Sequence, residues 1–86
     1  MDFAPEFAPD AESQWRELDD VLLQDLVWDV VEELSRNPPP GPEFCADFVR
    51  EGEEGWHYVF ISINIDHAKR KLTVGGVNRY FRPKAG

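Results

Sequence analysis

The amino-acid sequence predicts an α+β domain in which one long N-terminal helix packs, in two layers, on an antiparallel β-meander of three to four strands. Three observations predict this class. Apolar residues recur with a helical period in the first half of the chain. Apolar and polar residues alternate over short runs in the second half, and glycines and turn residues separate these runs. The length of 86 residues suits one domain with a modest core.

The first residues form an arm ahead of the expected helix, with a short echo: Phe3-Ala4-Pro5 is followed by Phe7-Ala8-Pro9. Proline fixes φ and disfavours helix at the residue before it, so we expect an extended arm over residues 1–9. Three alternatives stay open for the arm: disorder, docking of both phenylalanines on the domain, or docking on a partner. The single α+β domain is expected to occupy residues 10–86.

Residues 11–35 carry the pattern of an amphipathic helix with Asp10 as its N-cap. Such a helix would be about 37 Å long, so a bend or break near Asp19-Asp20 is compatible with the pattern. The proline run from Pro38 ends the helix and is interpreted as a stiff linker rather than a ligand for a partner domain. The expected core face holds two apolar rows, Leu18, Leu22, Leu26, Val30 and Leu34 in one and Leu23, Val27 and Val31 in the other.

Three segments after the linker are expected to be strands: residues 43–50, residues 56–65 and residues 71–75. Residues 77–81 are expected to add a short fourth strand, with Gly75-Gly76 marking a bulge or a tight turn. The order of these segments predicts a meander of hairpins beneath the helix.

The central segment 56–65 identifies the core side of the sheet. Its aliphatic side chains alternate with the others and fall on one face. Ile61 on this face and Leu26 in mid-helix are therefore expected to be nearly inaccessible. The predicted arrangement resembles the cystatin-like sheet that wraps one helix, in architecture only, and a shared architecture implies no function.

The formal net charge of −8 is divided unevenly along the chain. Residues 1–66 contain all 17 acidic residues and only three arginines, so they carry 3 − 17 = −14. Residues 67–86 contain six basic residues and no acidic ones, a charge of +6. The simplest interpretation is that the basic end folds back near the acidic helix and partly neutralises it.

No group of residues predicts a catalytic, cofactor or metal site, and we expect a non-enzymatic protein without a cofactor. Cys45, His57 and Asp47 supply the types needed for nucleophilic catalysis, but nothing predicts an oxyanion hole or a pocket beside them. His57 and His67 are ten residues apart, and no spacing resembles a zinc or calcium motif. One cysteine excludes an internal disulfide, and no apolar run is long enough for a membrane span. A cytoplasmic location is expected, in the host cytoplasm if the protein is viral.

The favoured function is that of a small acidic protein-binding module acting by stoichiometric binding, as an inhibitor, an immunity or antitoxin-like protein, a phage-encoded inhibitor or an adaptor. Its expected partner is a protein with a basic surface, including one that normally binds nucleic acid; a homodimer stays open. Trp28 interrupts the polar side of the helix, and a tryptophan ringed by carboxylates is typical of a steered interface. Cover by the sheet edge or the arm would also explain Trp28. The expected binding residues are Val21, Gln24, Asp25, Trp28, Asp29 and Glu32.

The alternative function is nucleic-acid binding by the basic C-terminal hairpin and tail. Basic and aromatic residues alternate there, a composition that can grip phosphates and stack bases. Trp56, Tyr58 and Phe60 on one face of the central strand can add a stacking platform. The charge of −14 on the rest of the chain argues against this alternative because it repels a polyanion. The residues expected to bind nucleic acid are Lys69, Arg70, Lys71, Arg79, Tyr80 and Arg82.

Overall fold

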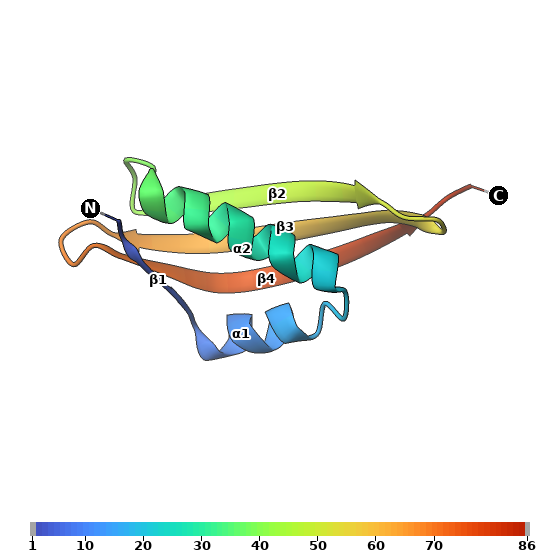
Figure 1. The fold of residues 1–86 in the computed structure, drawn as a ribbon, viewed down its shortest axis with the longest axis horizontal. Helices are drawn as coiled ribbons and strands as arrows, with labels where there is room; N and C mark the ends of the chain where they lie inside the picture. The colour runs from blue at the N-terminus through green and yellow to red at the C-terminus, as the bar shows by residue number, and fades with distance from the viewer. Residues whose placement is uncertain (1, 86) are drawn as a thin grey trace.

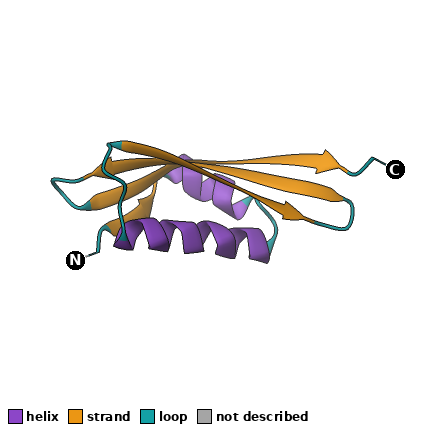
Figure 2. Cartoon of the chain, turned by 90° about the horizontal axis from the view of Figure 1, so that it is seen from above, coloured by secondary structure: helices purple, strands orange, loops and turns teal. Residues whose placement is uncertain are grey.

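The computed structural model describes residues 2–85, which form two helices and a four-stranded sheet (Figure 1). The α+β class is thus confirmed. Within these residues, both helices cover one face of the sheet and the other face is open (Figure 2). The domain is elongated, with extents of 50 × 22 × 17 Å. The elements in chain order are β1 (Ala4–Phe7), α1 (Pro9–Arg16), α2 (Val21–Arg36), β2 (Glu43–Glu51), β3 (Gly55–Asp66) and β4 (Lys71–Pro83).

The sheet is mixed, which corrects the expectation of an antiparallel sheet. Its order is β1-β4-β3-β2, and β2, β3 and β4 form the predicted antiparallel meander. Strand β1 comes from the N-terminal arm and pairs parallel to β4, with Ala4 opposite Lys71 and Phe7 opposite Val74. Of the three alternatives for the arm, the structure therefore has docking on the domain. Pro5 is tolerated in β1 because an edge strand can accommodate a residue without an amide hydrogen.

Strand β4 is one strand of 13 residues, so the two short strands expected at 71–75 and 77–81 are continuous. Ser62 of β3 pairs with Gly76, whereas the next residue, Ile63, pairs with Val74. Gly75 is left as the extra residue of a β-bulge, one of the two structures predicted for this pair of glycines. The bulge allows Val74 and Val77, three positions apart, both to face the core.

The expectation of a single long helix over residues 11–35 is wrong. The helical region is divided into α1 and α2 at Asp19-Asp20, where the sequence pattern is compatible with a bend or break. Asp19 has a φ of 53°, a left-handed conformation that aspartate adopts more readily than most residues. The carboxylate of Asp20 then caps α2 by accepting hydrogen bonds from the amides of Leu22 at 2.9 Å and Leu23 at 3.3 Å. Helix α1 begins at Pro9, so Asp10 lies in its first turn rather than at its N-cap.

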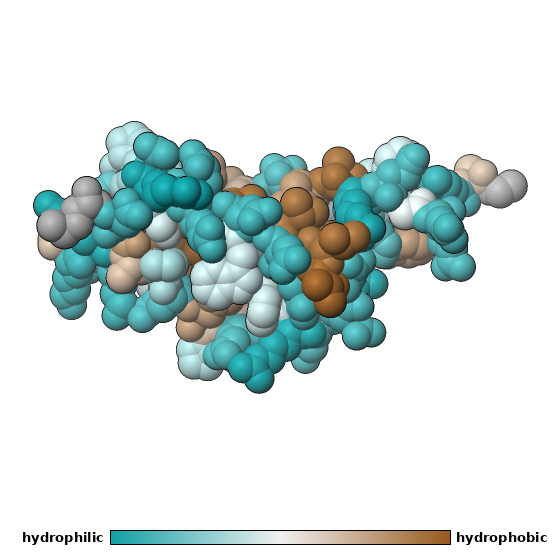
Figure 3. Space-filling view, viewed as in Figure 1, coloured by the Kyte–Doolittle hydropathy of each residue, from teal (hydrophilic) through white to brown (hydrophobic). Residues whose placement is uncertain are grey.

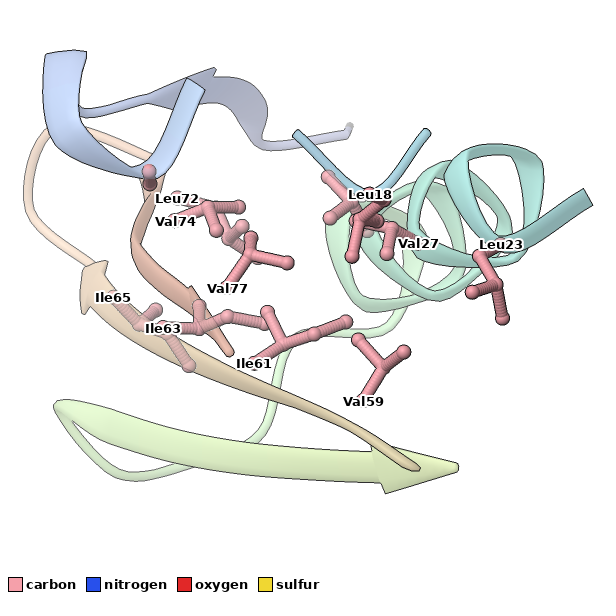
Figure 4. Close-up of a cluster of buried hydrophobic side chains, with 12 residues drawn as sticks. Leu18, Leu23, Val27, Val59, Ile61, Ile63, Ile65, Leu72, Val74 and Val77 are labelled. Atoms are coloured by element: carbon pink, nitrogen blue, oxygen red, sulfur yellow. The ribbon is translucent and has the colours of Figure 1, made fainter. Parts of the chain in front are cut away.

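The core lies between the helices and the inner face of β3 and β4 (Figure 4). Ile61 is buried, as expected, but Leu26 is 37% exposed and Leu22 is 54% exposed. The row that contains these two leucines is therefore only partly a core row: Leu18 is buried, and Val30 and Leu34 are partly buried against the core. A helix lying on a sheet buries one stripe, and the neighbouring row occupies that stripe. The buried residues are Ala11, Leu18, Leu23, Val27, Val31, Val59, Ile61, Ile63, Ile65, Leu72, Val74 and Val77.

Candidate functional site

The open face of the sheet carries a cluster of aromatic side chains. In β3, the side chains that alternate with the buried aliphatic ones point away from the helices. Tyr80 and Arg82 of β4 stand opposite Tyr58 and Trp56, and Val49 of β2 stands opposite Tyr58 from the other side. We call this set the aromatic face; its members are Val49, Trp56, Tyr58, Phe60, Tyr80 and Arg82.

Most of the aromatic face is accessible to a partner. Phe60 and Tyr80 are 47% and 60% exposed, and Trp56 and Val49 are also exposed. The rings of Tyr58 and Tyr80 lie 6.0 Å apart between centroids, at an interplanar angle of 53°. A shallow hollow of about 480 Å³ lies against Tyr58, Phe60, Tyr80 and Arg82. The face thus offers flat rings beside a depression.

Sheet stability alone explains only part of this cluster. A cross-strand pair such as Tyr58–Tyr80 stabilises a sheet by about 0.2–1 kcal/mol, so these two rings have a structural reason to be there. Phe60, by contrast, stands between Asp47 and Asn78, neither of which is an apolar neighbour. An antiparallel sheet with one solvated face normally presents polar side chains there. The exposure of Phe60 therefore points to a binding role for this face.

Charged side chains of both signs border the aromatic face. The ammonium of Lys84 lies 5.9 Å from the centroid of the Trp56 ring, within cation–π range, and 3.7 Å from the carboxylate of Glu51. Asp47 lies on the same face beside Phe60. Because this border carries charges of both signs rather than only positive ones, it favours a protein surface over a polyanion as a partner.

The helix surface predicted from the sequence is only partly exposed. Val21, Asp25, Asp29 and Glu32 are exposed on α2. Trp28, the predicted anchor, is partly buried: its ring centroid lies 5.2 Å from that of Phe7 and 6.3 Å from that of Trp15. The side-chain amide of Gln24 already makes a hydrogen bond within the domain, because it donates to the carbonyl of Trp15 at 3.3 Å. The interpretation in which the arm covers Trp28 accounts for this packing, and partner binding by this surface stays a prediction.

The residues predicted to bind nucleic acid do not form one site. Lys69 and Lys71 lie at the β3–β4 turn, where the ammonium of Lys71 pairs with the carboxylate of Glu6 at 3.1 Å. Arg70 lies in the same turn, with a φ of 53°. Tyr80 and Arg82 lie toward the other end of β4, about 30 and 36 Å from Lys71 at about 3.3 Å per residue. Arg79 lies on the helix side, where its guanidinium donates to the carbonyl of Leu18.

The residues considered for nucleophilic catalysis are also kept apart. Cys45 and Asp47 lie on the open face, whereas His57 pairs with Arg50 and lies on the helix side. The Nδ1 atom of His57 is buried and, within residues 2–85, has no hydrogen-bond partner. In the same residues, no group of three His, Cys, Asp or Glu side chains could hold a metal ion.

A polar hollow of about 730 Å³ lies on the helix side, between the residues that join the helices and the far half of β4. His57, Arg79 and Asp20 are among its lining residues. Burial opposes ionisation of Asp20, but the amides of Leu23 and Leu22 and the guanidinium of Arg50, at 2.9 Å, outweigh it and lower the pKa of this carboxyl. Through these contacts the Asp20 carboxylate stabilises the N-terminus of α2, so its charge has a structural role.

Comparison of the chain with known protein families, with curated proteins and with solved structures found no match. Within residues 2–85, no helix is both long and apolar enough to cross a membrane. Reasoning from the sequence named Trp56, Tyr58 and Phe60 only as a stacking platform and missed Val49. The signal was present, because three aromatic residues at alternate positions of a strand share one face.

Proposed function

We propose that this protein is a small acidic protein-binding module that acts by stoichiometric binding and uses the aromatic face as its contact surface. The exposure of Phe60 and Tyr80 on a helix-free sheet face carries the proposal. Tryptophan, tyrosine and arginine are the residues most enriched among interface hot spots, and the aromatic face contains all three. The net charge of −8 favours a partner with a basic surface.

Single-stranded nucleic acid is the second candidate for the same face. Exposed rings with Arg82 and Lys84 beside them are a composition that also stacks bases. The carboxylates of Asp47 and Glu51 on the same face disfavour it, because they would repel phosphates. A protein partner therefore remains the favoured occupant.

The test compares two surfaces by quantitative capture of partners from an extract of the native source. The double variant Phe60→Ser/Tyr80→Ser removes the two most exposed rings, and Asp29→Lys alters the exposed surface of α2 as a matched control. We expect the double variant to lower partner recovery about tenfold or more, and Asp29→Lys to change it by less than about threefold. Urea unfolding must show both variants within about 1 kcal/mol of the parent, as expected for exposed positions.

The opposite result, loss of the partner with Asp29→Lys alone, would assign binding to α2 instead. Salt-sensitive binding of a single-stranded oligonucleotide, abolished by Phe60→Ser/Tyr80→Ser, would establish the second candidate. Each outcome therefore selects one surface and one class of partner.

A further inference from the structure

Strand β2 lies at an edge of the sheet, and no strand in residues 2–85 pairs with its outer side. The strand is nine residues long, which is long for an uncovered edge. Such an edge presents a row of main-chain donors and acceptors to any extended chain that approaches it. The side chains along β2 indicate which kind of chain would fit.

Two backbone hydrogen bonds determine which residues of β2 face outward. Gly52 donates to Gly55 at 2.7 Å in the hairpin, and Ile65 donates to Pro42 at 2.8 Å beyond the other end of the strand. In an antiparallel ladder, hydrogen-bonded and non-hydrogen-bonded pairs alternate, so the even-numbered residues of β2 bond to β3. The odd-numbered residues direct their amide and carbonyl groups to the outer edge. They are Glu43, Cys45, Asp47, Val49 and Glu51.

Three of these five outward-facing residues carry carboxylates, spaced four positions apart along the edge. Their side chains all lie on the open face of the sheet. A strand added to β2 would place its own side chains directly beside them, so like charges would be repelled and lysine or arginine would be attracted. The ammonium of Lys84 lies 3.7 Å from the carboxylate of Glu51, so Glu43 and Asp47 contribute most to the negative charge of the open side, which selects a cationic segment.

The helix side of the same edge is apolar over residues 44–48, and Arg50 at its end pairs with Asp20 of the α2 cap. Phe44 of β2 is exposed and Phe48 is partly buried, and both point toward the helix layer. Leu22 and Leu26 lie on the flank of α2 opposite Trp28. Because Trp28 contacts β1 at one edge of the sheet, this flank faces the other edge, that of β2. Figure 3 shows apolar surface over the N-terminal half of α2, to the right of centre.

We propose that the outer edge of β2 takes an extended cationic segment of the partner protein as a fifth strand. Lysine or arginine at alternate positions of that segment would lie beside Glu43, Asp47 and Glu51. Apolar residues at the intervening positions would pack beside Phe44 and Phe48, while the backbones form a hydrogen-bonded ladder. This inference rests on the proposed protein-binding function and names the chemistry of the bound segment.

A second copy of the chain fits the edge less well. Antiparallel pairing of two β2 strands about their centre would place Asp47 against Asp47 and Glu43 against Glu51. Each copy also carries a net charge of −8. Charged edges are one means by which proteins prevent such self-association. The carboxylates therefore exclude a like strand and admit one of opposite charge.

The binding test uses a labelled nine-residue peptide that alternates lysine and valine, with a glutamate–valine peptide as the charge control. We expect the lysine peptide to bind, to weaken as salt rises, and to protect the odd-numbered amides of β2 from hydrogen exchange. Asp47→Lys should weaken binding about tenfold or more, whereas Glu17→Lys, the same charge change at the exposed end of α1, should change it by less than about threefold. Failure of the lysine peptide to bind, or equal binding of both peptides, would overturn the proposal.

Cys45→Pro tests the backbone ladder separately from charge. Its amide faces outward and is not needed for pairing with β3, so proline there blocks strand addition without removing an internal hydrogen bond. Cys45→Ala keeps the amide and is the matched control. We expect the proline variant to lose peptide binding and the alanine variant to retain it. Equal peptide binding by folded forms of both variants would overturn the proposal. A homodimer of the parent protein that Cys45→Pro dissociates would overturn it as well. If Cys45→Pro retains the native partner while Phe60→Ser/Tyr80→Ser loses it, the edge inference fails and the proposed function stands.

Discussion

Truncation of Leu23 tests how α2 is oriented on the sheet. The side chain of Leu23 is fully buried, and replacing it by alanine removes three carbon groups from the core. At about 0.8 kcal/mol per buried group, the lost transfer free energy is about 2.4 kcal/mol. The cavity left behind raises the cost to about 3–4 kcal/mol, within the usual range for buried leucine. A domain of 86 residues has only about 4–13 kcal/mol of stability, so Leu23→Ala should be nearly unfolded or clearly destabilised.

Leu22 provides the matched control because it is the neighbouring residue of the same helix and is 54% exposed. Less than half of the transfer term is lost there, no closed cavity forms, and alanine favours the helix slightly, so Leu22→Ala should cost about 1 kcal/mol or less. Urea unfolding followed by circular dichroism measures both free energies of unfolding. If the two variants differ by less than about 0.5 kcal/mol, the assignment of the buried stripe of α2 is refuted.

Two further predictions concern contacts that hold the helices in place. Asp20→Ala should cost about 1–2 kcal/mol at neutral pH, because it removes the N-cap of α2 and the pair with Arg50, whereas Asp25→Ala on the exposed side of α2 should cost less than about 0.5 kcal/mol. Since folding lowers the pKa of Asp20, the stability contributed by its carboxylate is present above the unfolded-state pKa near 4 and is lost as pH falls through the folded-state pKa. Urea unfolding of parent and variant at several pH values should therefore show that their difference in free energy of unfolding narrows only below about pH 4. Trp28→Ala should cost about 2–3 kcal/mol because its partly buried ring packs on Phe7 and Trp15; a cost below about 0.5 kcal/mol in urea unfolding would contradict this packing and favour the interface interpretation of Trp28.

The helical period predicted that this part of the chain is helical, but not its division into α1 and α2 or the stripe that α2 buries. Two adjoining apolar rows are equivalent in a sequence, because either one can face a sheet. The break at Asp19-Asp20 and the position of the sheet edge decide between them, and both are tertiary features. Leu23 and its row are covered, while Leu22 and Leu26 extend beyond the covered stripe. Local pattern thus predicted the element, and only packing determined its orientation.

Strand β1 shows a second limit of local pattern. Four residues that include a proline carry too little alternation to predict a strand, and the segment they pair with, residues 71–74, is distant in the sequence. The strands of the meander could be predicted because each pairs with its neighbour in sequence across a short turn. The aromatic face was visible in the alternation of residues 56–60, but its exposure depends on both helices covering the same side of the sheet. Sequence therefore predicted the cluster without predicting that it is open.

The pairing of β1 with β4 has a consequence for how the chain folds. Glu6 and the Thr73 side chain that bonds to it are 67 positions apart. Closing a loop of that length costs about 3.7 kcal/mol of chain entropy by the (3/2)RT ln n relation, far more than a two-residue hairpin turn. Contacts of such high sequence separation form slowly, and during synthesis residues 4–7 cannot pair until residues 71–74 have left the ribosome. The hairpins of β2, β3 and β4 are thus expected to form first, and the N-terminal strand to complete the sheet as the last step of folding.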